Sequence, residues 1–243
     1  MIGIFVWSGP QEGRFKRTVA LREETVLHTR FLFGEISRGP KTPEALLRRR
    51  VLSAAKQMRK RGVTRVVAPE GFSYGPYLEK AGLRLFSTVP LRKRLAADWV
   101  KVYLGRRGLS QAGAKVAVAA AQMTGELVRT VTELSLRHRY VLLDVPYGGE
   151  ELCRRLRREY GVSLLLSPEK GQIQGADVAV LFDPRPELEQ EICLPVYRED
   201  VPLPPLVLPP AVEDRLPKGI CRERFAAALM EAGALRPGQI SLG

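Results

Sequence analysis

The sequence predicts an α/β protein in which a parallel sheet with crossover helices follows a smaller, basic α/β domain. Two observations lead to this prediction. From residue 115 to residue 182, short apolar runs alternate with longer amphipathic stretches, a spacing typical of parallel strands joined by helices. The charge is also uneven, because residues 1–110 hold 23 Lys+Arg against 8 Asp+Glu, whereas residues 111–200 hold 11 against 14. The net charge of +13 therefore originates in the N-terminal part.

The predicted first domain, residues 1–108, begins with strands at 2–7 and 25–33, because both runs are rich in β-branched and aromatic side chains. Turn residues at 8–13 separate them. A helix is expected to begin with Thr42 as N-cap and Pro43 in its first position, and to end at Gly62. A strand, a helix, a strand and a longer helix are then expected at 63–68, 76–81, 83–86 and 90–104.

The predicted second domain, residues 109–200, follows the glycine-containing segment 105–113, which has no periodicity. Strands and helices are expected to alternate at 115–119, 124–137, 140–145, 149–159 and 162–166, with a further strand at 177–182. Residues 201–243 form a third segment. Its first ten residues contain five prolines, which excludes a sheet interior and favours an extended strap, and residues 222–232 form a final amphipathic helix.

Residues 114–184 also carry a recognisable pattern. Lys115–Val118 form an apolar strand, a helix opens near Gly125, Asp144 closes the second strand, and Ala176–Val180 open a later one. This span, about 70 residues, resembles the Rossmann-like NAD(P)-binding domains of the shikimate dehydrogenase and pyrroline-carboxylate reductase type. The resemblance implies a Rossmann-like parallel sheet and a nucleotide, NAD(P) or another, as cofactor.

The phosphate-binding loop departs from the family pattern G-x-G-x-x-G, because Ala120, Gln122 and Gly125 stand at the three glycine positions. In that pattern the second glycine lets the backbone approach a pyrophosphate, where Gln122 places a side chain instead. The third glycine packs the helix on the strand, and Gly125 retains it. The free N–H groups of the helix N-terminus still suit an anion, and Thr124 or Gln122 can add a hydrogen bond. The expected cofactor-binding residues are Ala120, Gln122, Thr124, Gly125, Asp144 and Asp183.

The two acidic residues in this set have alternative interpretations. Asp144 follows Gly125 by 19 residues, which suits a ribose ligand, but it equally suits a cap for the helix after Gly148. Asp183 stands at a strand's carboxyl end, where ligands of open α/β sheets bind, and with Pro184 it also forms an ordinary turn. Residues 120–125, 144–149 and 183–185 are therefore the expected mouth of a ligand pocket.

Other kinds of site have no sequence signal. The histidines are isolated, with His28 expected inside a strand and His138 at a helix C-terminus, and no catalytic triad order, metal-ligand spacing or Walker loop is present. No catalytic residue or metal ligand is therefore assigned. Three scattered cysteines fit a reducing compartment, and no apolar run is long enough for a signal peptide or a membrane helix, so a cytoplasmic location is expected.

Two functional hypotheses of different classes follow. In the first, a Rossmann-like protein binds a nucleotide or a small anionic ligand without a standard glycine loop, and catalysis is left open. In the second, a non-enzymatic protein uses its basic residues 1–110 to bind nucleic acid or an acidic protein partner. The solvated faces of helices explain the same charge without a partner. The sequence does not indicate an oligomeric state.

Overall fold

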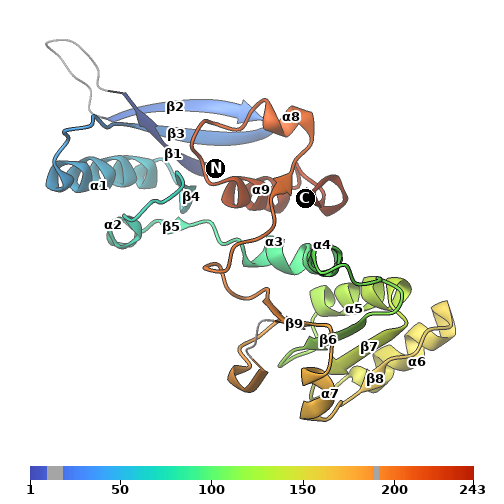
Figure 1. Cartoon of the computed structure of the whole chain (residues 1–243). Coiled ribbons are helices and arrows are strands. Elements are labelled where there is room, and N and C mark those ends of the chain that lie inside the picture. Colours follow the sequence, from blue (N-terminus) through green and yellow to red (C-terminus); the bar gives the residue numbers. More distant parts are fainter. Residues whose placement is uncertain (10–18, 189–191) are drawn as a thin grey trace, which may run out of the picture. The chain divides into compact units, whose positions relative to one another are not determined.

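The computed structural model describes residues 1–9, 19–188 and 192–243, which divide into two compact units (Figure 1). Unit 1 consists of residues 1–88 and 208–239, and unit 2 of residues 89–207 and 240–243. This division differs from the predicted boundary at residue 108, and the C-terminal segment is shared between the units. The turn expected at 8–13 lies mostly outside the described residues.

Unit 1 is built on a five-stranded sheet in the order β2-β3-β1-β4-β5. Phe5, Leu32 and Ile36 on one face of this sheet belong to a core with the buried side of α1. On the other face, the ring of Phe31 lies 5.9 Å from that of Phe225 in α9. The elements are β1 (Ile2–Ser8), β2 (Val19–Val26), β3 (Thr29–Ser37), α1 (Glu44–Lys60), β4 (Arg65–Val67), α2 (Gly75–Lys80), β5 (Arg84–Leu85), α8 (Pro210–Glu213) and α9 (Arg222–Glu231).

The strand expected at 25–33 is wrong, because the chain reverses there. Leu27 and His28 both have positive φ angles, 47° and 66°, and form the two-residue turn between β2 and β3. The strands pair antiparallel, with Val26 opposite Thr29. Neither turn residue is the glycine or asparagine that usually signals such a hairpin. His28 is accordingly exposed at a turn and does not lie inside a strand.

Unit 2 contains a five-stranded sheet in the order β10-β9-β6-β7-β8, and every neighbouring pair is parallel. Counted along the chain within this unit, the order is 3-2-1-4-5 when read from β8, which is the Rossmann order. The predicted Rossmann-like α/β architecture is confirmed. The elements are α3 (Val89–Arg94), α4 (Ala96–Arg106), β6 (Lys115–Ala119), α5 (Gly125–Arg137), β7 (Tyr140–Asp144), α6 (Gly149–Tyr160), β8 (Leu165–Leu166), α7 (Lys170–Gln174), β9 (Val178–Leu181), β10 (Cys193–Pro195), β11 (Leu206–Val207) and β12 (Ser241–Leu242).

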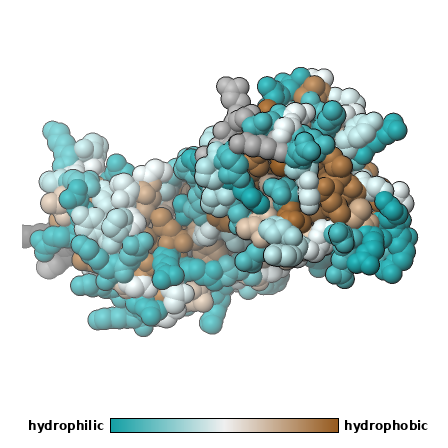
Figure 2. All heavy atoms as spheres, turned by 90° about the horizontal axis from the view of Figure 1, so that it is seen from below, coloured by the Kyte–Doolittle hydropathy of each residue, from teal (hydrophilic) through white to brown (hydrophobic). Residues whose placement is uncertain are grey.

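The two faces of the unit 2 sheet are covered unequally. Valines and leucines of one face pack against α4, α5 and α6, whereas Ala117, Ala119 and Ala179 on the other face pack near the five-residue helix α7. A hollow of about 510 Å³ lies on the α7 side, lined by Leu142, Leu165 and their neighbours. Figure 2, seen from below Figure 1, shows hydrophobic residues gathered between hydrophilic ones in the right-hand part of the view.

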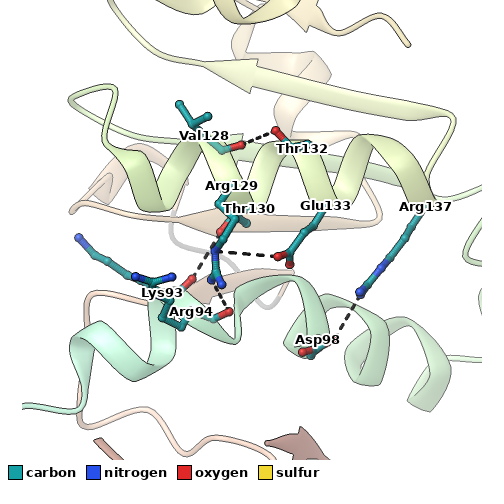
Figure 3. A network of polar contacts seen from close by, with 9 residues as sticks. All are labelled: Lys93, Arg94, Asp98, Val128, Arg129, Thr130, Thr132, Glu133 and Arg137. Atoms are coloured by element: carbon teal, nitrogen blue, oxygen red, sulfur yellow. Dashed lines mark hydrogen bonds and ion pairs between the residues drawn. The ribbon is translucent and has the colours of Figure 1, made fainter. Parts of the chain in front are cut away.

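Polar contacts fasten α3 and α4 to α5 and explain why both helices belong to unit 2 (Figure 3). Arg129 donates to the carbonyl oxygen of Arg94 at 2.7 Å, and Arg137 pairs with Asp98 at 3.2 Å. Trp99 and other buried side chains of α4 join the core beneath them. The single helix expected at 90–104 is in fact two helices separated at Leu95. This packing fixes α5, whose N-terminus faces the expected ligand pocket.

Candidate functional site

The candidate site lies at the carboxyl ends of β6, β7 and β9, where the strand order reverses between β6 and β9. The structure brings three of the six expected residues together there. The backbone N–H of Ala120 donates to the carbonyl oxygen of Asp144 at 3.0 Å. The next amide, that of Ala121, donates to the Asp183 carboxylate at 2.8 Å. The Asp183 side chain therefore already occupies one backbone amide of the loop that would bind phosphate in a Rossmann domain.

Asp183 has a counterpart at the other end of the same strand. Asp177 precedes β9, and its carboxylate accepts a 2.7 Å hydrogen bond from the backbone N–H of Lys115 at the start of β6. Both carboxylates thus bind backbone amides at opposite ends of β6 and help to fix the pairing of β6 with β9. Of these two aspartates, Asp183 is the one at the carboxyl edge of the sheet, within the expected mouth.

The N-terminus of α5 offers backbone donors that the protein leaves open. Thr124 is the N-cap, and its hydroxyl oxygen accepts from the amide of Leu127 at 3.2 Å. Within the described residues, the amides of Gly125 and Glu126 have no acceptor. A methyl group added at Gly125 would meet nothing within 4 Å, so the packing role expected for this glycine is wrong. Gln122, Thr124 and Gly125 instead form an exposed rim beside free helix amides.

Asp144 is half-buried and lies beside Arg185, which the sequence places in the expected mouth, within 183–185, without a role of its own. A guanidinium nitrogen of Arg185 lies 3.6 Å from the Asp144 carboxylate and donates to the carbonyl oxygen of Ala120 at 3.2 Å. Asp144 does not cap α6, because the N-cap of that helix is Gly148, without a side-chain hydrogen bond. Of the two interpretations of Asp144, the capping role is therefore wrong. Arg185 also approaches Glu187 at 3.8 Å.

A second set of cations lies next to this mouth and was missed. A hollow of about 590 Å³ is lined by Met123 and Val128 on the α5 side, by Gly148, and by Glu151, Leu152, Arg154, Arg155 and Arg158 of α6. The sequence predicts a helix over 149–159, in which Arg154 and Arg155 pair with Glu150 and Glu151 one turn before them and have no ligand-binding role. Their periodicity on one helix face was visible, but the hollow beside them depends on how α5 and α6 pack.

No group near the mouth is assigned a catalytic role. His138, at the C-cap of α5, is 4% exposed, and its Nδ1 lies 2.5 Å from the carbonyl oxygen of Gln111. Burial lowers the pKa of His138 below its usual value, more than the hydrogen bond from its ring to Gln111 raises it. Among the described residues, no three side chains are grouped as a metal site would require. Within the same ranges, no helix is both long and apolar enough to cross a bilayer.

No family model matches the chain, and no curated protein matches its sequence. Solved structures with similarity include L-tryptophan dehydrogenase from Nostoc punctiforme, which is 13% identical, with 62% of this chain and 44% of that one covered and a TM-score of 0.29. The A chain of dipicolinate synthase from Bacillus subtilis is 10% identical, with 54% of this chain and 44% of that one covered and a TM-score of 0.34. Shikimate 5-dehydrogenase from Listeria monocytogenes, in complex with shikimate and NAD, is 8% identical, with 65% of this chain and 62% of that one covered and a TM-score of 0.28.

The match spans less than two thirds of the length of each of these structures. At such identities and TM-scores, the similarities carry no argument about residues or function. The Rossmann-like assignment of unit 2 rests on the strand order and parallel pairing of this chain.

Proposed function

We propose that unit 2 binds a nucleotide or another small anionic ligand at the carboxyl ends of β6, β7 and β9. The observation that supports this most is the pair of unpartnered amides of Gly125 and Glu126 at the start of a 13-residue helix. Such amides, together with the helix dipole, stabilise negative charge. A Cβ added at Gly125 would meet nothing within 4 Å, so no other side chain crowds this residue.

The proposed ligand position differs from that of a dinucleotide in a glycine-rich loop. A pyrophosphate that bound the Ala121 amide would have to displace the Asp183 carboxylate. An anion at the first turn of α5 makes no such demand. Arg185 partly balances the negative charge of Asp144, which lowers the repulsion that an incoming anion meets. In this proposal Asp144 is the acceptor for a ribose hydroxyl.

Thermal-shift and calorimetric titrations with NAD, NADP, ATP and S-adenosylmethionine test the proposal, since a ligand that binds the folded state raises the melting temperature. Gly125→Pro is the informative variant. Proline is tolerated in the first helical position, and Thr124 before it already has the extended backbone that a proline requires (φ −109°, ψ 160°). The variant therefore removes one free N–H while the helix is retained.

Gly125→Ala is the matched control, because it also adds a Cβ but keeps the N–H group. A hydrogen bond to a charged group contributes roughly 1.5–3 kcal/mol, so the proline variant is expected to bind the responding ligand at least about tenfold more weakly than the alanine variant. Equal affinities of the two variants would remove α5 from the site. No response to any of the four compounds at millimolar concentration would contradict the proposal as a whole.

Binding of nucleic acid or an acidic protein by residues 1–110 stays a prediction. The described ion pairs already neutralise part of that charge, for example Arg22 with Glu35 at 2.8 Å and Arg48 with Glu44 at 3.2 Å.

A further inference from the structure

The hollow between α5 and α6 has an unbalanced positive charge. Arg154, Arg155 and Arg158 line it together with a single carboxylate, Glu151. These four residues fall on one face of α6, since positions three and four apart in a helix are neighbours. Three guanidinium groups and one carboxylate give this face of α6 a net positive charge where it lines the hollow.

The arginines of this face are largely without internal partners. Across the described residues, Arg154 and Arg155 take part in no recorded ion pair, although Glu151 is four residues before Arg155. Arg158 approaches only its neighbour Glu159, at 3.7 Å, and its side chain is 80% exposed. The α5 side of the hollow is formed by Met123 and Val128 and contributes no carboxylate. An anion would therefore meet donors that need not first break an ion pair.

An exposed aromatic side chain, Tyr147, lies beside this hollow. A second hollow, of about 400 Å³, shares Gly148, Glu151 and Arg154 with the first and is lined also by Tyr147 and by a second carboxylate, Glu150. Tyr147 is 86% exposed, the highest value among the exposed large hydrophobic side chains of the described residues. Gly148, between the two hollows, has a φ angle of +82°, a conformation that favours glycine. Gly148 lines both hollows, so the two adjoin one another at this residue.

We infer that the ligand of this mouth is a nucleoside monophosphate or a larger molecule that contains one. Its phosphate monoester lies against Arg154, Arg155 and Arg158, and its base stacks on Tyr147. A phosphate monoester carries nearly two negative charges at neutral pH and accepts several hydrogen bonds, which suits planar guanidinium donors. An aromatic side chain can stack on any of the nucleobases, because each base has a π-face. This inference rests on the proposed function, because Met123, Tyr147 and Gly148 belong to the mouth.

The test uses AMP, adenosine and inorganic phosphate as probes, each titrated calorimetrically into the full chain at low salt. The parent protein is expected to bind AMP at least about tenfold more tightly than either fragment. The double variant Arg154→Gln/Arg155→Gln is expected to lose roughly tenfold in affinity for AMP, in line with two partly exposed charges. Tyr147→Leu is expected to weaken AMP and leave inorganic phosphate unchanged.

Arg157→Gln is the matched control, since Arg157 is an exposed arginine of the same helix that does not line either hollow. An equal loss in this control would reduce the effect to general charge attraction and overturn the inference. AMP that does not bind, or binds the double variant as it binds the parent, would overturn it too. Gly125→Pro separates the two proposals: if it weakens AMP and the α6 variants do not, the proposed function holds and this inference fails.

Discussion

Replacing Asp183 by asparagine is expected to strengthen anion binding at the mouth of unit 2. The Asp183 carboxylate accepts a 2.8 Å hydrogen bond from the Ala121 amide, so it lies at the edge where the free amides of α5 begin. An asparagine side-chain oxygen can accept the same bond, and the substitution therefore removes charge while it keeps the contact. For an anion roughly 6 Å away, the repulsion removed is about 0.7 kcal/mol in bulk water and about 3 kcal/mol at an effective dielectric constant of 20.

Because the mouth is open to solvent, the lower part of this range applies, and affinity for ATP is expected to rise about threefold to tenfold. Calorimetric titration at low ionic strength measures the change, and it should shrink in about 0.5 M salt, where charges are screened. Asp177→Asn is the control, since Asp177 makes the equivalent bond to Lys115 at the far end of β6. Equal changes in ATP affinity for the two variants, or a weaker affinity for Asp183→Asn, would contradict this prediction.

Three further variants test the fold. Gly3→Ala is expected to lower the free energy of unfolding by roughly 1–3 kcal/mol in denaturant titration, because the new methyl would lie 2.6 Å from a methyl of the stiff side chain of Val66; an unchanged midpoint would contradict this packing. Leu27→Asn with His28→Gly should raise the same free energy by about 1 kcal/mol, since both positions have positive φ, and a loss of stability would argue against the turn. His138 has a pKa lowered by burial, so its neutral form favours the folded state; the stability that it contributes is complete above pH about 6.5 and is lost as the pH falls through the lower folded pKa. His138→Gln should flatten the decline of the melting temperature between pH 7 and 5, and an equally steep decline would contradict the assignment.

The second half of the fold could be predicted because its local signals agree. The central parallel strands are continuous apolar runs, as in residues 116–119 of β6 and Val178–Leu181 of β9, and each long helix has its own start signal or amphipathic pattern. The edge strands were harder to define. Strand β8 has only two residues, and β10 has three and ends in Pro195. At that length, pairing with a neighbouring strand decides the conformation, and the sequence carries no periodicity to reveal it.

The N-terminal hairpin was missed for a different reason. Val26 and Thr29 are adjacent partners across the turn, and their side chains continue the β-branched pattern on both sides of it. Leu27 and His28 interrupt that pattern without the usual turn residues, so residues 25–33 read as one strand. The antiparallel pairing of β2 with β3 over eight residue pairs holds the reversal in place despite its unfavourable turn.

The position of the candidate site on the sheet could be predicted from the sequence, but the contacts between its charged side chains could not. The positions of Asp144 and Asp183 at strand ends follow from the alternation of elements, and both lie at the expected edge. The contact of Arg185 with Asp144 could not be predicted, because it depends on how the segment after β9 folds back toward β7. The open space at Gly125 was likewise invisible, since a glycine in a motif gives no indication of what packs against it.

These contacts give a physical account of why the first loop dispenses with its glycines. A loop whose Ala121 amide is already bound by Asp183 has no need to bring its backbone against a pyrophosphate, so Ala120 and Gln122 are tolerated there. Small residues are required instead in the loop between β7 and α6. Gly148 has a left-handed conformation beside Met123, and a methyl group at Gly149 would lie 3.3 Å from Val145. A ligand that fits this chain is therefore expected to lie toward the second loop and the α5–α6 hollow, so substituting Gly148 should impair binding more than substituting Gln122.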